Sequence, residues 1–282
     1  LILYFEMTIN YFYKNTKSKF LEISGLDSIT FIQNLITNDI NKSGKNEFIY
    51  SCLLTPQGKF LSDFFIYKKN EKFILEINEK FYENFLNKIN LYKLQSKVKI
   101  AELYSKYSFV IFSETKVKSK YEIFNYDPRN KLIGKKLITN EPLVKFNLIL
   151  NEINEKTYHE ILIKNKIPYS PYDLEENKSL LLENNFDNIN AISWDKGCFI
   201  GQEITARMKY RSLLKKKLYS LKILNGSISV GEKVIQNNQD LGYVVSKEKD
   251  YLFCMLKIDK VNDKIKNDEI LQTDSSASLK FL

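Results

Sequence analysis

The hydrophobic pattern changes near Lys217, and this change restricts the folds open to the chain. Before that point, strand-like runs joined by turns alternate with amphipathic segments of helical period, which favours an α+β body. After it come short β-type runs, several of them separated by Gly226, Gly231 and Gly242. Short strands of this kind favour a small barrel. We therefore predict an interleaved α+β body at 7–211 and a C-terminal β-barrel at 212–282.

The body has clear helix and hairpin signals. Strands are predicted at 20–24, 48–54, 60–67, 72–77, 98–103 and 108–112, with helices at 80–94 and 202–211. A further helix is predicted to begin with Asp27 or Ser28 as its N-cap. Its apolar face is predicted to hold Ile29, Ile32, Leu35 and Ile36. Pro168 and Pro171 interrupt the chain, so 169–173 is predicted to be a loop.

One short segment concentrates residues that carry chemistry. Cys198 lies between Gly197 and Gly201, follows Lys196, and precedes the helix that begins at Gln202. Glycines permit positive φ angles and close backbone approach. A lysine and a helix N-terminus beside a cysteine both lower the pKa of its thiol. The alternative interpretation is a buried structural cysteine, since free cysteines are among the most buried residues.

The helix after this cysteine carries paired charges. Glu203 precedes Arg207 by four residues, and Arg211 repeats that spacing, so one helix face carries an acid and two guanidiniums. Three roles stay open for Arg207 and Arg211. They could hold the loop through Glu203, bind an anion or dock a partner.

The other cysteines and the single histidine give no second site. Cys52 and Cys254 lie in apolar runs and are predicted to be core residues, and His159 is predicted to be structural. With no CxxC pair, we expect no disulfide framework and no metal or cluster site within a single chain. These features predict a reducing compartment, the cytoplasm.

The chain is basic, with a formal net charge of +9. A basic chain attracts nucleic acid, anionic membranes or small polyanions, but lysines scattered over solvated faces explain the same total. We expect no membrane partner, because no apolar run is long enough to span a bilayer. Residues 1–6 precede Met7, and they lack the basic start of a secretory signal.

The segment Lys196-Gly-Cys-Phe-Ile-Gly-Gln-Glu203, followed by Ala206-Arg207 and Tyr210-Arg211, resembles the signature of the YgfZ family of folate-binding, T-protein-like proteins. Ser212 stands where the family pattern has a glycine. Three further blocks resemble the family in order: 33–40, 53–59 with Asp63, and 182–184. The resemblance implies a T-protein-like fold, with two interleaved ferredoxin-like subdomains and a C-terminal barrel.

The resemblance also implies a folate site. It places Asp63 beside the folate amines, Glu183 near the pterin, and Tyr158 where an aromatic ring could stack on the folate. A carboxylate can accept paired hydrogen bonds from a pterin. The simpler alternatives are an aspartate on the solvent face of a hairpin, a surface glutamate, and one aromatic among 18 tyrosines and 19 phenylalanines.

The implied function is that of an accessory protein for iron–sulfur cluster assembly or repair, with tRNA-modifying iron–sulfur enzymes among the candidate clients. Tetrahydrofolate or a related folate is the expected cofactor, a cluster is expected only transiently, and Cys198 is the functional thiol. An accessory role is favoured over that of a turnover enzyme. Two alternatives stay open: a tetrahydrofolate-dependent aminomethyltransferase of glycine cleavage, and a basic tRNA-binding module.

Overall fold

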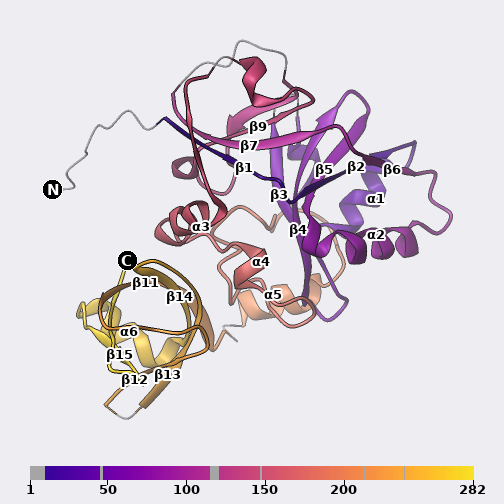
Figure 1. Ribbon diagram of the computed structural model, residues 1–282. Helices are drawn as coiled ribbons and strands as arrows, with labels where there is room; N and C mark the ends of the chain where they lie inside the picture. The colour runs from indigo at the N-terminus through magenta and orange to yellow at the C-terminus, as the bar shows by residue number, and fades with distance from the viewer. Residues whose placement is uncertain (1–9, 45–46, 115–120, 147, 212–213, 238) are drawn as a thin grey trace.

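The computed structural model describes residues 10–44, 47–114, 121–146, 148–211, 214–237 and 239–282 (Figure 1). The interpretations of residues 1–6, Met7 and Ser212 lie outside these residues. Two five-stranded sheets form the body, and a closed barrel follows them. Within the described residues, no helix is both long and apolar enough to cross a membrane.

The two sheets of the body are interleaved along the chain. The first has the order β3-β4-β5-β2-β6 and the second the order β10-β1-β7-β9-β8. Strand β1 precedes all strands of the first sheet, whereas β7 to β10 follow them, so the chain enters, leaves and re-enters the second sheet. The predicted α+β, T-protein-like class is confirmed. The bounds are β1 (Tyr11–Lys14), β2 (Ser18–Ser24), β3 (Phe48–Leu54), β4 (Phe60–Lys69), β5 (Lys72–Asn78), β6 (Lys99–Leu103), β7 (Tyr107–Phe112), β8 (Ile123–Tyr126), β9 (Lys135–Thr139) and β10 (Asn151–Ile153).

Helices cover the first sheet and begin and end at recognisable signals. Helix α2 (Glu79–Lys93) is capped by the Asn78 side chain, which accepts a hydrogen bond from Lys80 N. Its buried residues Phe81, Tyr82, Phe85 and Ile89 repeat at helical spacing, and it contacts β4 and β5. The other helical segments of the body are α1 (Ser28–Leu35), η1 (Ile40–Lys42), η2 (Lys131–Ile133), η3 (Leu143–Phe146), α3 (Glu155–Lys164), α4 (Ser170–Asp173) and α5 (Gln202–Tyr210).

Three local predictions for the body were wrong. Ile29 is 44% exposed, because Ser28, Phe31, Ile32 and Leu35 form the buried face of α1 instead. Asp27 occupies the N-cap position, but its carboxylate accepts from Lys97 N rather than capping the helix. The predicted loop at 169–173 contains the short helix α4, because Pro171 lies in its first turn, where the missing N–H costs nothing.

The barrel packs against α3 and α4 (Figure 1). Its strands close in the order β11-β14-β13-β12-β15-β16. Ile163 of α3 forms one apolar cluster with Leu218, Phe253 and Met255 of the barrel. Helix α6 (Ile258–Lys266) follows β14. The strand bounds are β11 (Lys216–Asn225), β12 (Lys233–Gln236), β13 (Gln239–Glu248), β14 (Tyr251–Lys257), β15 (Leu271–Thr273) and β16 (Ser278–Phe281).

Candidate functional site

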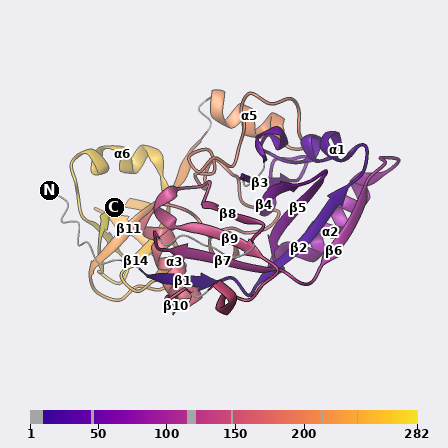
Figure 2. The same ribbon diagram turned by 90° about the horizontal axis from the view of Figure 1, so that it is seen from above.

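The cysteine loop is fastened to the turn between β3 and β4. Gly201 is the N-cap of α5 with φ 82°, and Gly58 in the turn has φ 71°. A Cβ atom built on Gly201 would lie 2.6 Å from Thr55 O and 3.0 Å from Gly58 Cα. No side chain fits in that gap, so two segments far apart in the sequence meet through glycines. Figure 2 shows α5 beside α1, and Ile200 N donates to Asn34 O there.

Lys196 anchors the start of the loop to the end of α1. Its side chain is buried, and Nζ donates to the carbonyl oxygens of Gln33 at 2.6 Å, Ile36 at 2.6 Å and Asn38 at 2.9 Å. Burial lowers the pKa of Lys196 to about 8, and the nearby Asp39 carboxylate opposes that effect. All three ammonium donors are therefore used to join the loop to the end of α1. The sequence predicted a role for Lys196 beside the Cys198 thiol, but its ammonium binds these backbone carbonyls instead.

Cys198 is the exposed cysteine of the three, while Cys52 and Cys254 are buried. Its neighbour Phe199 is buried and lies 5.2 Å from Lys196 Nζ, measured to the ring centroid. Gly197 is exposed, and a Cβ built there would meet no described atom within 4 Å. It is also absent from the positive-φ glycines of the described chain, so its predicted special backbone role was wrong. The thiol thus projects from a loop anchored on both sides of it.

The helix after the loop displays charge to solvent. Arg207 and Glu203 form the predicted i,i+4 pair at 2.5 Å, with side chains 51% and 72% exposed. Arg211 is exposed at the C-cap of α5, and Gln202 is half-buried in its first turn. Trp194 packs against Tyr210 with Lys209 over its ring, which fixes the helix end. Cys198, Glu203, Arg207 and Arg211 therefore lie on one exposed segment.

Asp63 is half-buried and lines a small cavity of about 40 Å³ in the body. Tyr50 and Ser170 each donate a hydroxyl hydrogen bond to its carboxylate. Burial raises the pKa of Asp63, while these two hydrogen bonds and the charge of Arg129 act in the opposite direction. Burial is the largest influence and leaves the pKa of Asp63 above its ordinary value.

Buried charges fill the rest of this cavity. Glu76 and Lys136 form an ion pair of 2.9 Å with both side chains only 3% exposed. Arg129 binds Asp127 through Nε at 3.0 Å and Nη2 at 2.9 Å. Sequence reasoning missed Glu76, Lys136 and Arg129. The available signal for Glu76 was a charge flanked by apolar residues in a strand, the same signal that singled out Asp63, whereas Lys136 follows Lys135 and had no such signal.

Tyr158 also lines the cavity, but its ring is already stacked. It lies 4.4 Å from the Tyr13 ring at an interplanar angle of 13°, and its hydroxyl accepts from Arg129 Nη2 at 3.1 Å. Glu183 does not line the cavity; it lies near the barrel, 3.5 Å from Lys216 Nζ, and its carbonyl accepts from Leu218 N. The structure therefore brings Asp63 and Tyr158 together and leaves Glu183 apart from both.

His159 is a structural bridge between body and barrel, as the sequence predicted for a lone histidine. Its two ring nitrogens lie 3.3 Å from Asp173 of α4 and 3.3 Å from Glu248 of β13. Burial alone would lower the pKa of His159, but the hydrogen bonds and charges of these two acids outweigh it and raise that pKa. Asp173 also accepts from Ser246 of the barrel. This bridge fixes α4, whose Ser170 reaches Asp63.

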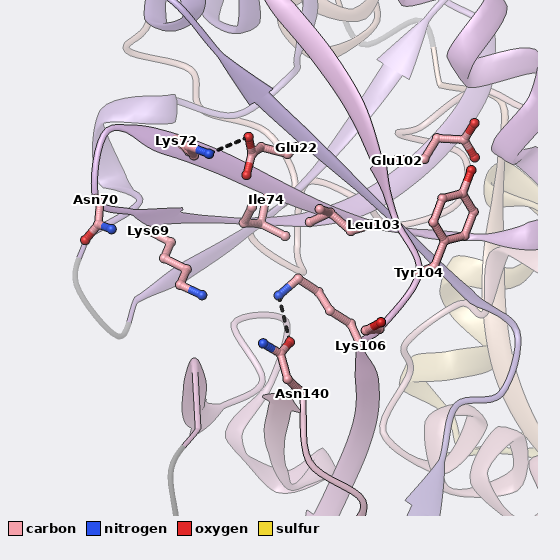
Figure 3. Close-up of a pocket in the computed structure, with 11 residues that line it drawn as sticks. Glu22, Lys69, Asn70, Lys72, Ile74, Glu102, Leu103, Tyr104, Lys106 and Asn140 are labelled. Carbon is pink, nitrogen blue, oxygen red and sulfur yellow. Dashed lines mark hydrogen bonds and ion pairs between the residues drawn. The ribbon is translucent and has the colours of Figure 1, made fainter.

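A surface cleft of about 410 Å³ lies elsewhere, between the loops of the two sheets. Figure 3 shows the Lys69 and Lys106 side chains pointing toward its space. Both ammonium groups bind Glu122 at 2.6 Å, and Lys72 binds Glu22 at 2.8 Å. None of the sequence-predicted site residues lines it. Its charges already satisfy one another, so we assign it no role.

A pterin fits the chemistry of the Asp63 cavity but not its volume. Aromatic walls and a carboxylate suit a flat heterocycle with N–H donors. Asn78 Nδ2, on the cavity wall, is one of the buried donors without a hydrogen-bond partner in the described chain. Pockets for ligands of drug size span roughly 300–1,000 Å³, several times the space present. The cavity therefore has polar groups that suit a pterin, but it is too small to hold one.

Comparisons with known proteins agree with this architecture. The family model described as GCVT N-terminal domain matches residues 15–112. An aminomethyltransferase T of the glycine cleavage system from Bartonella henselae has the same fold, with a TM-score of 0.77 at 10% identity over 98% of this chain and 86% of that one. The predicted T-protein-like fold is therefore confirmed.

Relatives in sequence carry two names. The "tRNA-modifying protein YgfZ" of Buchnera aphidicola is 28% identical, covering 75% of this chain and 72% of that protein. The mitochondrial "Iron-sulfur cluster assembly factor IBA57" of Mus musculus is 26% identical, covering 72% and 63%, and the homologue in Mycosarcoma maydis is 25% identical, covering 71% and 54%. The chain spans about half the length of the fungal relatives it matches. The chain is thus similar in sequence to proteins of the YgfZ and IBA57 types.

Proposed function

We propose that this chain is an accessory protein for iron–sulfur cluster assembly or repair, with Cys198 as its functional thiol and a folate as its ligand. Relatives named as iron–sulfur cluster assembly factors support the cluster role. The observation that carries it is the contrast among the cysteines: two are buried, and Cys198 projects from an anchored, exposed loop.

A single thiolate can supply one ligand, whereas clusters are usually held by four. Cys198 would therefore contribute to a cluster shared with a partner protein, which supplies the remaining ligands. The exposed Arg207 and Arg211 on the same segment would meet carboxylates of that partner. In this arrangement the cluster is the cargo and the loop is its docking site.

The thiol proposal is tested by Cys198→Ala in cells that lack the wild-type protein, with the activity of an iron–sulfur enzyme as readout. We expect that activity to be lost while the variant keeps its thermal stability. Asp195→Asn, an exposed change on the same loop, is the matched control and should retain activity. Full activity of the iron–sulfur enzyme with the Cys198→Ala variant would contradict the proposed role of the thiol.

The folate proposal is tested separately by calorimetry with tetrahydrofolate. Binding should be saturable, weakened by Asp63→Asn, and kept by Cys198→Ala, because the cavity and the loop are separate places in the fold. Glu183→Gln would report whether the ligand extends to the barrel side. Clear turnover in a glycine-cleavage assay would favour an aminomethyltransferase instead, a candidate kept by the shared fold.

A further inference from the structure

A second, larger space shares one lining residue with the 40 Å³ cavity around Asp63. A cleft of about 520 Å³ lies where the body meets the barrel, lined on the body side by Asn185 and Lys166 and on the barrel side by Lys217 and Ser220. Among the described residues that line either space, Arg129 is the one that lines both. Arg129 thus borders both the small Asp63 cavity and a space large enough for a ligand.

The guanidinium of Arg129 is held as a flat ligand would be. Its Cζ lies 5.1 Å from the Tyr50 ring centroid and 5.0 Å from that of Phe65. Nε and Nη2 meet both oxygens of Asp127 in a paired arrangement. A planar group with adjacent N–H donors, stacked on aromatic rings and paired with a carboxylate, is also how a heterocycle bearing an amino group on a ring amidine would be recognised.

Arg129 lies in the segment between β8 and η2 rather than inside a strand or helix. A swing of its side chain breaks the two hydrogen bonds to Asp127 and the one to Tyr158, and leaves the backbone in place. If the guanidinium leaves, the cavity and the cleft become one space, with Asp63 at its inner end. Lys166 and Lys217 line the outer part, where they suit an anionic tail.

We infer that Arg129 closes a passage between the cleft and the Asp63 cavity, and that a ligand with a flat heterocyclic head and an anionic tail enters from the cleft and displaces its guanidinium. This inference rests on the proposed folate function for the ligand class, but the passage itself rests on the geometry of Arg129. It explains why the cavity has polar and aromatic groups that suit a pterin but is too small to hold one. The closed form reduces apparent affinity by the fraction of molecules that are open.

The passage is tested first without any folate. In Arg129→Ala, ethylguanidinium in the millimolar range should refill the vacated slot and raise the melting temperature saturably, whereas ethylammonium should not. Arg207→Ala, an exposed arginine, is the matched control and should respond to neither probe. A folded Arg129→Ala variant that gains nothing from ethylguanidinium overturns the passage.

The gating role is tested by association kinetics with 5-formyltetrahydrofolate. The double variant Asp127→Asn/Arg129→Gln avoids leaving an unpaired buried charge and serves where Arg129→Ala fails to fold. We expect its association rate to rise about tenfold over wild type. An unchanged rate with normal binding overturns the gate and leaves the proposed function standing. Rescue by ethylguanidinium with no folate binding to any variant supports the passage and removes the folate proposal.

Discussion

The Asp63 cavity and the Cys198 loop differ in what they bury and what they expose. The cavity is lined by acids and bases contributed by β4, β5, β9 and the segment after β8. The partners of Asp63 and Glu76 lie far away in the sequence, whereas Arg129 pairs with Asp127, two residues before it. The loop exposes its reactive atom and buries only what anchors it, namely Phe199, Gly201 and the ammonium of Lys196. Charge is thus costly to disturb in the cavity, whereas backbone geometry is costly to disturb in the loop.

The largest effect is expected in the cavity. Lys136→Met removes the partner of Glu76, both only 3% exposed, and should lower the free energy of unfolding by about 3–5 kcal/mol. Denaturant unfolding measures it. The double change Glu76→Leu/Lys136→Met should recover much of the loss, because no charge is then left unpaired. A single variant within 1 kcal/mol of wild type, on the order of one hydrogen bond, would show that water reaches this pair.

Lys196 should be the most sensitive side chain of the loop. Lys196→Met leaves the carbonyls of Gln33, Ile36 and Asn38 without their donor. We expect a loss of about 3 kcal/mol, since unsatisfied buried polar groups cost about 1–3 kcal/mol each and part of the site can relax. Lys88→Met, an exposed change on α2, is the control in the same unfolding experiment. Equal effects from the two variants would contradict the anchoring role.

The two glycines beside Cys198 should behave differently. Gly201→Ala places a Cβ 2.6 Å from Thr55 O at a φ of 82° and should cost about 2 kcal/mol or more. Gly197→Ala meets no described atom within 4 Å and should change stability by less than about 0.5 kcal/mol. Thermal unfolding of both variants separates them. A neutral Gly201→Ala would mean that the loop and the β3–β4 turn are not locked together.

The His159 bridge adds a pH dependence to the cavity side, because it fixes α4. Its pKa is raised in the folded state, so the folded protein binds this proton more tightly than the unfolded chain. The stabilisation is complete below the unfolded pKa of about 6.5, and it is lost as pH rises through the folded pKa. We expect wild type to lose about 1 kcal/mol relative to His159→Gln over that rise, the size of one hydrogen bond. If the stability of wild type and of His159→Gln changed in parallel with pH, the stabilising role of the bridge would be contradicted.

The smallest effect belongs to the exposed pair on α5. Glu203→Gln breaks an i,i+4 contact between side chains 72% and 51% exposed, and should cost only about 0.3–0.5 kcal/mol. The difference should shrink further in high salt. If Glu203→Gln nevertheless abolishes client activity in cells, the pair belongs to the partner surface rather than to the stability of the loop.

Much of this molecule is determined by local sequence. The change of pattern near Lys217 predicted the barrel, and the helices α2 and α5 were found within one or two residues of their predicted bounds. The Glu203–Arg207 pair and the buried Cys52 and Cys254 also followed from spacing and hydrophobicity. These features depend on period and composition within a short window, which is why a single sequence suffices for them.

Only the tertiary structure decided where the charged groups go. Nothing in the sequence near Lys196 shows that its ammonium binds the carbonyls at the end of α1, or that Gly201 meets Gly58. The sequence alone also could not show that Asp63, Tyr158 and Arg129 share one cavity while Glu183 lies apart from it. A polar group carries the same local signal whether its partner is solvent or a distant backbone, and only the packing of the two sheets and the barrel settles which one it meets.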